Sequence, residues 1–374
     1  MATDNLGLYV HIPYCIRKCN YCDFCSLPLG DGAVPDSYIS RLIDEIRAYS
    51  KAEKRVLTTI YFGGGTPSLL APDKMRLIVS AIKESFAIAD NAEITFEANP
   101  GTLSEEKALE YRRLGFNRVS MGLQSIHDNE MKKLGRIHDY EDFLKSYNLL
   151  RKAGFDNINV DLMYGIPDQT KESFALTLEN IIALAPNHIS CYGLIIEEGT
   201  PFYKMADTLN VPELDDECDM YEIAARMLAD NGYSHYEISN YARAGFESRH
   251  NLIYWNSDDY IGVGAAAHSC LDGIRRSNTE DVSEYVSSHG ILPKEEHSPD
   301  EDEAAYTYAM LKLRLKSGFS LSEYRERFGR SFLDGRESAI ANMEKNGLLK
   351  LENDRIFLTE RGFYVSNGIL VEIL

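Results

Sequence analysis

The sequence predicts an α/β fold, in which a partial (β/α)6 barrel of the TIM type precedes an α+β insertion and a C-terminal winged-helix-like domain. Up to residue 195, a β-rich apolar run followed by a loop and an amphipathic helical stretch occurs six times. Such βα units form a parallel sheet with helical crossovers. Six units are fewer than the eight of a closed barrel, so an open doubly wound sheet also fits.

Each element follows from hydrophobic periodicity. Short apolar runs predict six strands at Leu8–Tyr14, Thr58–Phe62, Glu93–Ala98, Arg118–Gly122, Asn157–Tyr164 and Ile189–Ile195. Apolar residues at helical spacing predict helices between them, at Ser37–Tyr49, Asp73–Phe86, Ser104–Leu114, Tyr140–Ala153 and Lys171–Leu184. In either sheet architecture, functional side chains belong at the carboxyl ends of the strands and in the loops that follow.

The rest of the chain is organised differently. Residues 201–292 contain one helical stretch, Asp215–Ala229, and a region rich in Gly, Tyr and His. A polar segment with two prolines then leads to residues 303–374, where three short helices precede the apolar runs Leu348–Leu351 and Arg355–Leu358. We therefore predict domains at 1–200, 201–292 and 303–374. Winged helices often bind DNA, but the acidity of this chain favours a packing or lid role.

Composition narrows the function classes. The 374 residues include 39 Lys and Arg against 58 Asp and Glu, a formal net charge of −19. This charge repels phosphate backbones and anionic lipid, and no run of five basic residues offsets it. No segment has 18 uninterrupted apolar residues, and the start, Met1–Asn5, lacks the features of a signal peptide. We expect a cytoplasmic protein with no nucleic-acid partner and no stable membrane insertion.

Four of the seven cysteines lie within eleven residues, which in a chain without a leader indicates metal binding. Cys15, Cys19 and Cys22 form a C-x3-C-x2-C motif directly after the first strand. Three thiolates on a cubane iron–sulfur cluster leave one iron open to a ligand that is not protein. The alternative is a zinc loop whose fourth ligand is Cys25 or His11.

Further candidate residues end the other strands. Gly63-Gly64-Gly65-Thr66-Pro67 follows the second strand, where bare backbone lets a ligand approach closely, although a tight turn would also need glycine. Glu97 and Gln124 end strands three and four, and Arg136 follows soon after. Asp161 lies inside an apolar strand, where a charge is costly unless it is paired or bound to a ligand.

The cysteine spacing resembles that of the radical S-adenosylmethionine (SAM) superfamily, and the glycine loop is similar to the loop that holds the SAM amino group there. This resemblance implies a radical SAM barrel that carries a [4Fe–4S] cluster on Cys15, Cys19 and Cys22, with SAM on the open iron. In that superfamily the reduced cluster cleaves SAM to a 5′-deoxyadenosyl radical.

Within the superfamily, Leu8 to about Trp255 resembles oxygen-independent coproporphyrinogen III oxidase and its relatives, which include the HemW haem chaperones. The shared motifs run from Tyr9-Val10-His11-Ile12-Pro13 to Gly165-Ile166-Pro167. The resemblance implies that Tyr9, Gly65 and Glu97, with the loop through Pro67, contact one SAM. It implies that a second SAM site is formed by Tyr21, Thr66, Gln124, Arg136 and Asp161.

One segment that resembles the chaperones, and two differences from the oxidase pattern, favour the chaperone branch. Arg249–Trp255 contains H-N-x-x-Y-W, which resembles the haem-binding signature of HemW proteins and implies His250 as a haem ligand. A buried His packed among aromatic residues is the alternative. The oxidase has a fourth cysteine two residues after the third, where this chain has Phe24. The oxidase also has a longer N-terminal arm before its cluster motif, whereas only fourteen residues precede Cys15 here.

The sequence therefore predicts a haem chaperone that carries a [4Fe–4S] cluster and SAM and delivers haem to haem-requiring proteins such as respiratory enzymes. A homodimer and SAM cleavage are left open. The first alternative is oxidative decarboxylation of coproporphyrinogen III. The second, a radical SAM enzyme that modifies RNA, is disfavoured by the charge.

Overall fold

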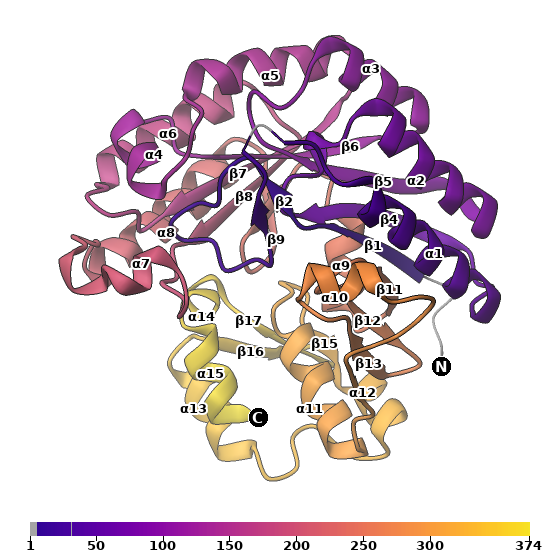
Figure 1. Ribbon diagram of the computed structural model, residues 1–374. Coiled ribbons are helices and arrows are strands. Elements are labelled where there is room, and N and C mark those ends of the chain that lie inside the picture. Colours follow the sequence, from indigo (N-terminus) through magenta and orange to yellow (C-terminus); the bar gives the residue numbers. More distant parts are fainter. Residues whose placement is uncertain (1–5, 31) are drawn as a thin grey trace.

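The computed structural model describes residues 6–30 and 32–374 (Figure 1). One large mixed sheet is the main feature of the fold. Its N-terminal strands and their helices occupy the upper part of the molecule in this view, and the C-terminal residues form a separate unit below them. Met1–Asn5, on which the expectation of no signal peptide rests, lie outside the described residues.

The sheet has the strand order β14-β13-β12-β11-β1-β4-β5-β6-β7-β8-β10-β9, and its two end strands are not paired with each other. All six predicted strands are present and parallel: β1 (Leu6–Ile12), β4 (Leu57–Gly64), β5 (Ile88–Ala98), β6 (Arg118–Gln124), β7 (Asn157–Tyr164) and β8 (His188–Gly193). A further parallel strand, β11 (Asp259–Val263), pairs with β1. Sequence periodicity missed β11 because it lies in the Gly-rich region and belongs to no βα unit.

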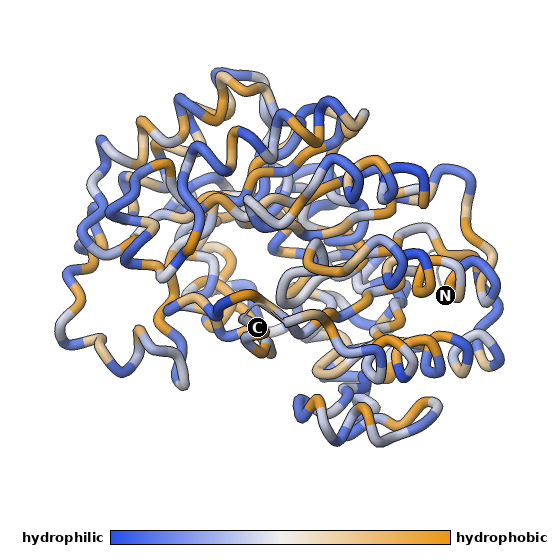
Figure 2. Tube along the Cα trace, turned by 45° about the horizontal axis from the view of Figure 1, so that its top comes forward, coloured by the Kyte–Doolittle hydropathy of each residue, from blue (hydrophilic) through white to orange (hydrophobic). Residues whose placement is uncertain are grey.

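The predicted helices form one layer over the sheet: α1 (Asp36–Ala52), α2 (Pro72–Ser85), α3 (Glu105–Leu114), α5 (Tyr140–Lys152), α6 (Lys171–Ala183) and α8 (Leu214–Asp230). Their ends are set by local chemistry. In α3, for example, the Ser104 side chain accepts from the Lys107 N–H, and Gly115 ends the helix in the left-handed conformation. Hydrophobic and hydrophilic positions alternate around these helices (Figure 2), as expected when one face packs on a sheet.

Residues 201–292 add strands to both edges of this same sheet. Antiparallel β10 (Asn240–Ala242) and β9 (Ser234–Glu237) extend it beyond β8. Antiparallel β12 (His268–Leu271), β13 (Ile274–Ser277) and β14 (Glu295–His297) extend it beyond β11. Tyr241, Ile261 and Val263 belong to the hydrophobic core formed by the N-terminal strands and helices, so sheet and core run across residue 200.

The C-terminal residues pack around a core of their own. As predicted, three helices precede a hairpin: α11 (Glu301–Lys312), α12 (Leu321–Phe328) and α13 (Glu337–Lys345), then β16 (Leu349–Glu352) and β17 (Arg355–Leu358). A short strand, β15 (Phe319–Ser320), completes a three-stranded sheet, and α14 (Glu360–Tyr364) and α15 (Ser366–Ile373) follow. Tyr221 of α8 joins this second core, which fixes the unit against the large sheet.

Short elements complete the chain: β2 (Tyr14–Cys15), β3 (Leu27–Pro28), the 3-10 turns η1 (Pro67–Leu69) and η2 (Ala206–Thr208), α4 (Asp128–Leu134), α7 (Pro201–Lys204), α9 (Arg249–Trp255) and α10 (Val282–Ser287). Among the described residues, no helix combines the length and apolar character needed to cross a membrane.

Glu360 of α14 accepts from His235 of β9 at 3.0 Å and pairs with Lys316, so it joins the C-terminal unit to the sheet edge. The hydrogen bond with His235, followed by that with Lys316, lowers the pKa of Glu360 to about 2. We expect Glu360→Gln to lower the free energy of unfolding by at most about 1 kcal/mol, because the side chain is half exposed.

The sign of the pH effect follows from the lowered pKa. Glu360 makes its full contribution to the free energy of unfolding above its ordinary pKa of 4.5, and this contribution is lost as the pH falls toward 2. Urea unfolding at pH 7 and pH 3 tests this, with Glu352→Gln, an exposed residue of β16, as the control. Equal loss in both variants would show that the Glu360 pairs contribute nothing specific.

Candidate functional site

The cysteine motif lies on a loop that leaves the sheet directly after β1. The parallel pair β2–β3 closes the base of this loop, with Leu27 N donating to Pro13 O at 2.8 Å and Leu29 N to Cys15 O at 2.7 Å. Its tip is tied to α4 by a bond from Asn20 N to Leu134 O at 2.9 Å. Cys15, Cys19 and Cys22 are free, partly exposed thiols. Burial raises the pKa of Cys15 and of Cys22.

The two residues that could close a zinc loop point elsewhere. The Cys25 thiol donates to the Glu280 carbonyl at 3.4 Å. Both ring nitrogens of His11 are engaged, one with the Tyr9 hydroxyl at 3.0 Å and one with the Cys25 carbonyl at 2.9 Å. In this arrangement Cys25 and His11 are therefore held by other partners. Within the described ranges, no three His, Cys, Asp or Glu side chains are gathered closely enough to hold a metal ion, and this applies to Cys15, Cys19 and Cys22 as well.

A cavity of about 550 Å³ lies at the carboxyl ends of the parallel strands. Most of the predicted site residues line it: Cys15, Cys19, Cys22, Tyr21, Gly65, Thr66, Glu97, Gln124, Arg136 and Asp161. The structure thus brings together residues that are up to 146 positions apart in the chain, from Cys15 to Asp161. Tyr9, Pro67 and His250 are not among its lining residues.

A chain of hydrogen bonds connects two of the cysteines across the cavity wall. The Thr66 hydroxyl donates to the Cys15 sulfur at 3.3 Å and accepts from the Asn99 amide at 2.9 Å. The side-chain oxygen of Asn99 accepts from Arg136 at 2.9 Å, and Arg136 also donates to the Cys19 sulfur at 3.7 Å. These bonds hold the two sulfurs relative to the strand ends, and the bond from Thr66 opposes the rise that burial causes in the pKa of Cys15.

The glycine loop is required first by protein packing. A Cβ on Gly65 would lie 2.6 Å from both the backbone N and O of Tyr14. Gly64 has φ +107°, and a Cβ there would meet the His11 ring at 2.5 Å. Because the loop must lie flat against the end of β1, only glycine fits at these positions. The same bare backbone also faces the cavity.

Two carboxylates face the cavity from neighbouring parts of the sheet. Glu97 accepts from the Tyr61 hydroxyl at 2.8 Å and from Gly64 N at 3.1 Å. Burial, with a contribution from nearby Asp161, raises the pKa of Glu97 to about 7. Burial also raises the pKa of Asp161, although Ser190, Asn159 and Ser120 donate to it and oppose the shift. The cavity wall therefore contains one carboxyl group, that of Glu97, whose charge changes near neutral pH.

Gln124 occupies a strained position at the end of β6. Its φ is +77°, and the pairing with β7 shifts register between Gly122 and Gln124. The side-chain carbonyl accepts from the Tyr192 hydroxyl at 2.7 Å. Non-glycine residues in this backbone region persist only where their surroundings hold them, and they cluster at functional sites.

His250 lies beneath the cavity and is 1% exposed. Its Nδ1 contacts the Thr59 hydroxyl at 2.7 Å, and its Nε2 contacts the Tyr254 hydroxyl at 2.8 Å. The ring stacks on Tyr61 with centroids 5.1 Å apart. Burial lowers the pKa of His250 to about 3. In this arrangement neither ring nitrogen is open to a metal, so His250 as a haem ligand stays a prediction that requires α9 to move.

Sequence reasoning missed three side chains of the site. Asn99, which connects Thr66 to Arg136, stands two residues after Glu97, and strand periodicity alone could have placed both on one face. Tyr61 holds Glu97 and Tyr192 holds Gln124, but each contact joins different strands. No signal within one sequence reports such contacts.

Comparison with known proteins gives consistent matches. The radical SAM superfamily model matches residues 9–181, and the HemN C-terminal domain model matches residues 300–365. A Lactococcus lactis protein named heme chaperone HemW is 37% identical and covers 98% of this chain and 96% of its own length. A Bacillus subtilis protein of the same name is 35% identical and covers 96% and 97%.

The solved structure of coproporphyrinogen III oxidase (HemN) from Escherichia coli, described as a radical SAM enzyme, superposes with a TM-score of 0.87. The match covers 98% of this chain and 89% of that one, at 23% sequence identity. This likeness confirms the predicted radical SAM fold.

The close approach at Gly65 gives a direct test of the loop. We expect Gly65→Ala to destabilise the protein by about 1–3 kcal/mol, because the added methyl group would meet backbone atoms that cannot move alone. Gly122→Ala is the matched control in the same cavity wall. There the nearest atoms, at 3.2 Å, are side-chain ends of Arg136, Asn99 and Gln124, so we expect less than about 1 kcal/mol. Thermal unfolding of both variants measures the difference, and equal losses would contradict the packing argument.

Proposed function

Because the chain belongs to the HemW family of radical SAM proteins, we propose that it is a haem chaperone that carries a [4Fe–4S] cluster and SAM. One observation supports the cofactor part of this proposal most strongly. Three free cysteine thiols and the glycine, carboxylate and guanidinium groups that a SAM site needs all face a single cavity. On this proposal haem is the cargo, and haem-requiring proteins such as respiratory enzymes receive it.

The donor chemistry fits the cluster. Cys15, Cys19 and Cys22 would hold three irons through sulfur, and SAM would supply the fourth contact and the radical chemistry of the superfamily. Thr66 and Arg136 donate toward two of these sulfurs and thereby orient them. Ionised Glu97 would accept hydroxyl hydrogens of the SAM ribose. The cavity walls, built from strand ends, would exclude water from the bound molecule.

The cluster proposal is tested by anaerobic reconstitution followed by iron and sulfide analysis. We expect about four irons and four sulfides per chain in the wild type. Cys15→Ala should lose the cluster and its visible absorption. Cys25→Ala should retain both, because that thiol points to Glu280 and is not among the residues that line the cavity. Zinc in place of iron, or equal loss in both variants, would contradict the assignment.

The cargo proposal is tested on the same preparations. Wild type should bind haem, seen as a Soret band, and release it to a haem-free acceptor such as apomyoglobin. It should not convert coproporphyrinogen III when SAM and a reductant are present. Conversion of coproporphyrinogen III without haem binding would instead support the porphyrinogen enzyme.

The pKa of Glu97 predicts how SAM binding depends on pH. Between pH 6 and 8 the side chain ionises around a pKa of about 7, and only the ionised form accepts through both oxygens. We therefore expect SAM affinity to rise about tenfold over this range. Glu97→Gln should remove the rise, and Glu197→Gln, an exposed residue at the same cavity, should keep it. Calorimetric titration measures both, and an unchanged pH profile in Glu97→Gln would refute the role.

A further inference from the structure

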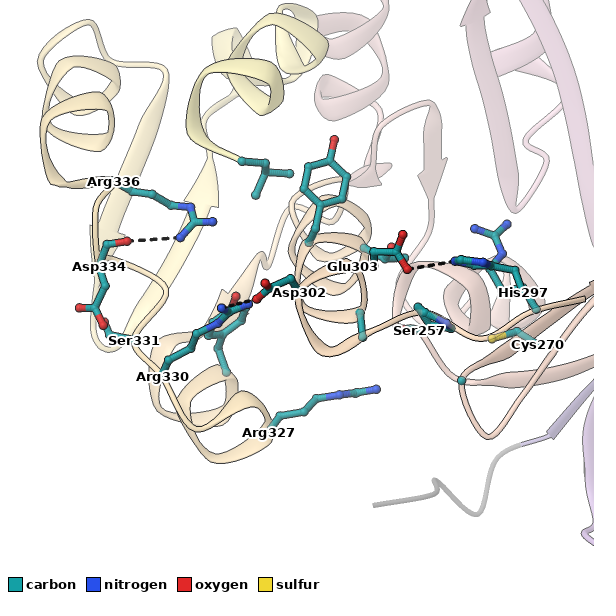
Figure 3. Close-up of a pocket in the computed structure, with 18 residues that line it drawn as sticks. Ser257, Cys270, His297, Asp302, Glu303, Arg327, Arg330, Ser331, Asp334 and Arg336 are labelled. Carbon is teal, nitrogen blue, oxygen red and sulfur yellow. Dashed lines mark hydrogen bonds and ion pairs between the residues drawn. The ribbon is translucent and has the colours of Figure 1, made fainter.

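Two hollows of the fold differ in how their walls are held together. A cleft of about 860 Å³ lies between strands β12–β14 and helices α11 and α12 (Figure 3). Its sides are joined directly, because Nε2 of His297 in β14 lies 3.1 Å from a carboxylate oxygen of Glu303 in α11. In the strand-end cavity, one wall includes Leu194, Ile195 and Glu197, from the connection between β8 and α8. The contacts of this connection therefore decide how that side of the cavity is closed.

Residues 195–209 of this connection form a strap that is attached at both ends near the end of β7. Leu194, directly before the strap, donates its N–H to the last carbonyl of β7 at 2.9 Å, and the carbonyl of Asn210, directly after the strap, accepts a hydrogen bond of 2.7 Å. Among the described residues, a single hydrogen bond joins the strap itself to the rest of the chain, from Phe202 N to Asn20 O at 3.0 Å. The middle of the strap is therefore held by the tip of the cysteine loop.

The side chain of Phe202, in α7, strengthens this attachment. It is 1% exposed and belongs to a small hydrophobic cluster with Leu134 of α4, Met163 of β7 and Ile166. Tyr21 of the cysteine loop packs against the same cluster. The strap and the tip of the cysteine loop thus share one packing unit, which is separate from the two main cores of the fold.

On its other side, the tip of the loop caps the C-terminus of α4. The last carbonyl groups of a helix have no partner within the helix. Asn20 supplies two partners, because its N–H donates to Leu134 O and its side-chain Nδ2 donates to Lys133 O, both at 2.9 Å. Gly135 follows with φ +76°, and a Cβ there would lie 2.9 Å from the Asn20 side chain. Glycine at this position therefore leaves the room that Asn20 needs.

The position of Asn20 in the sequence connects these contacts to the cluster motif. Asn20 directly follows Cys19 and stands two residues before Cys22. Arg136, which directly follows the glycine at the end of α4, donates to the Cys19 sulfur at 3.7 Å. A shift of the loop tip would therefore move Cys19 away from Arg136 and would release the strap at the same time.

We propose that Asn20 is a positioning residue that sets the cysteine loop against α4 and latches the strap to the loop, so that cluster binding and ordering of the strap are coupled. The inference rests on the proposed cluster function. A cluster bound through Cys19 and Cys22 restrains the loop on both sides of Asn20, and the strap then opens less often. Because coupling between two sites is reciprocal, a latched strap also favours the loop geometry that the cluster needs.

Hydrogen exchange of the full chain, followed by mass spectrometry, tests the latch. In the wild type we expect reconstitution of the cluster to slow exchange of the peptide that contains Phe202 by about fivefold or more. Asn20→Ala should speed this exchange by about fivefold in the cluster-free protein and should remove most of the slowing by the cluster. The matched control is Asn346→Ala, which removes a similar bond, from Nδ2 to Asn342 O at 2.9 Å, at the end of α13. It should leave exchange at Phe202 unchanged.

A second variant displaces Asn20 without changing the cysteine loop. Gly135→Ala places a methyl group against the Asn20 side chain. Gly329→Ala is its control, because Gly329 ends α12 with a similar φ of +68° and has no atom within 4 Å of an added Cβ. We expect Gly135→Ala and Asn20→Ala to retain less iron and to alter the electron paramagnetic resonance spectrum of the dithionite-reduced cluster, both alone and with SAM. Gly329→Ala should match the wild type.

The outcomes separate the latch from the cluster function. Exchange and spectra in Asn20→Ala that equal those of Asn346→Ala would overturn the inference, and so would exchange at Phe202 that the cluster does not change in the wild type. A wild type that takes up no iron would contradict the cluster function and the coupling to it. In that case, faster exchange in cluster-free Asn20→Ala would still support the latch, and unchanged exchange would overturn it.

Discussion

Arg136 is the residue on which the candidate site depends. Its guanidinium contacts the Cys19 sulfur, the Asn99 amide carbonyl and the Gly122 backbone carbonyl at once. A cationic group in a cavity wall is stable there only because acceptors surround it. These acceptors come from the cysteine loop, from the end of β5 and from β6. One side chain thereby fixes the loop relative to the strand ends and places its sulfurs against the cavity.

Much of this arrangement could be predicted from the sequence, because it depends on local signals. The parallel strands show as apolar runs, the helices as periodic stripes, and the cysteine motif as a spacing within one loop. What could not be predicted are contacts between elements distant in sequence. Asn99, Tyr61 and Tyr192 act through partners on other strands. The strand β11 was missed for a related reason, since only its pairing with β1 reveals it.

The aromatic layer beneath the cavity gives the segment around α9 a structural role that its motif alone does not indicate. Glu97 is held by Tyr61, Tyr61 stacks on His250, and His250 is bonded to Thr59 of β4. At the start of α9 the backbone N–H groups of Arg249 and His250 both donate to Glu93 of β5. Burial at this depth favours a neutral imidazole, and the nearby charge of Arg118 lowers the His250 pKa further. By stacking on Tyr61, His250 therefore helps to keep the Glu97 carboxylate in a fixed position.

The distribution of cations explains how so acidic a chain can hold anionic ligands. Long-range attraction cannot help a protein of net charge −19, so any anion must be met by cations placed locally. Arg118 and Arg136 provide these beneath and beside the strand-end cavity, where the charge of Arg118 opposes the rise that burial causes in the pKa of Glu97 and of Asp161.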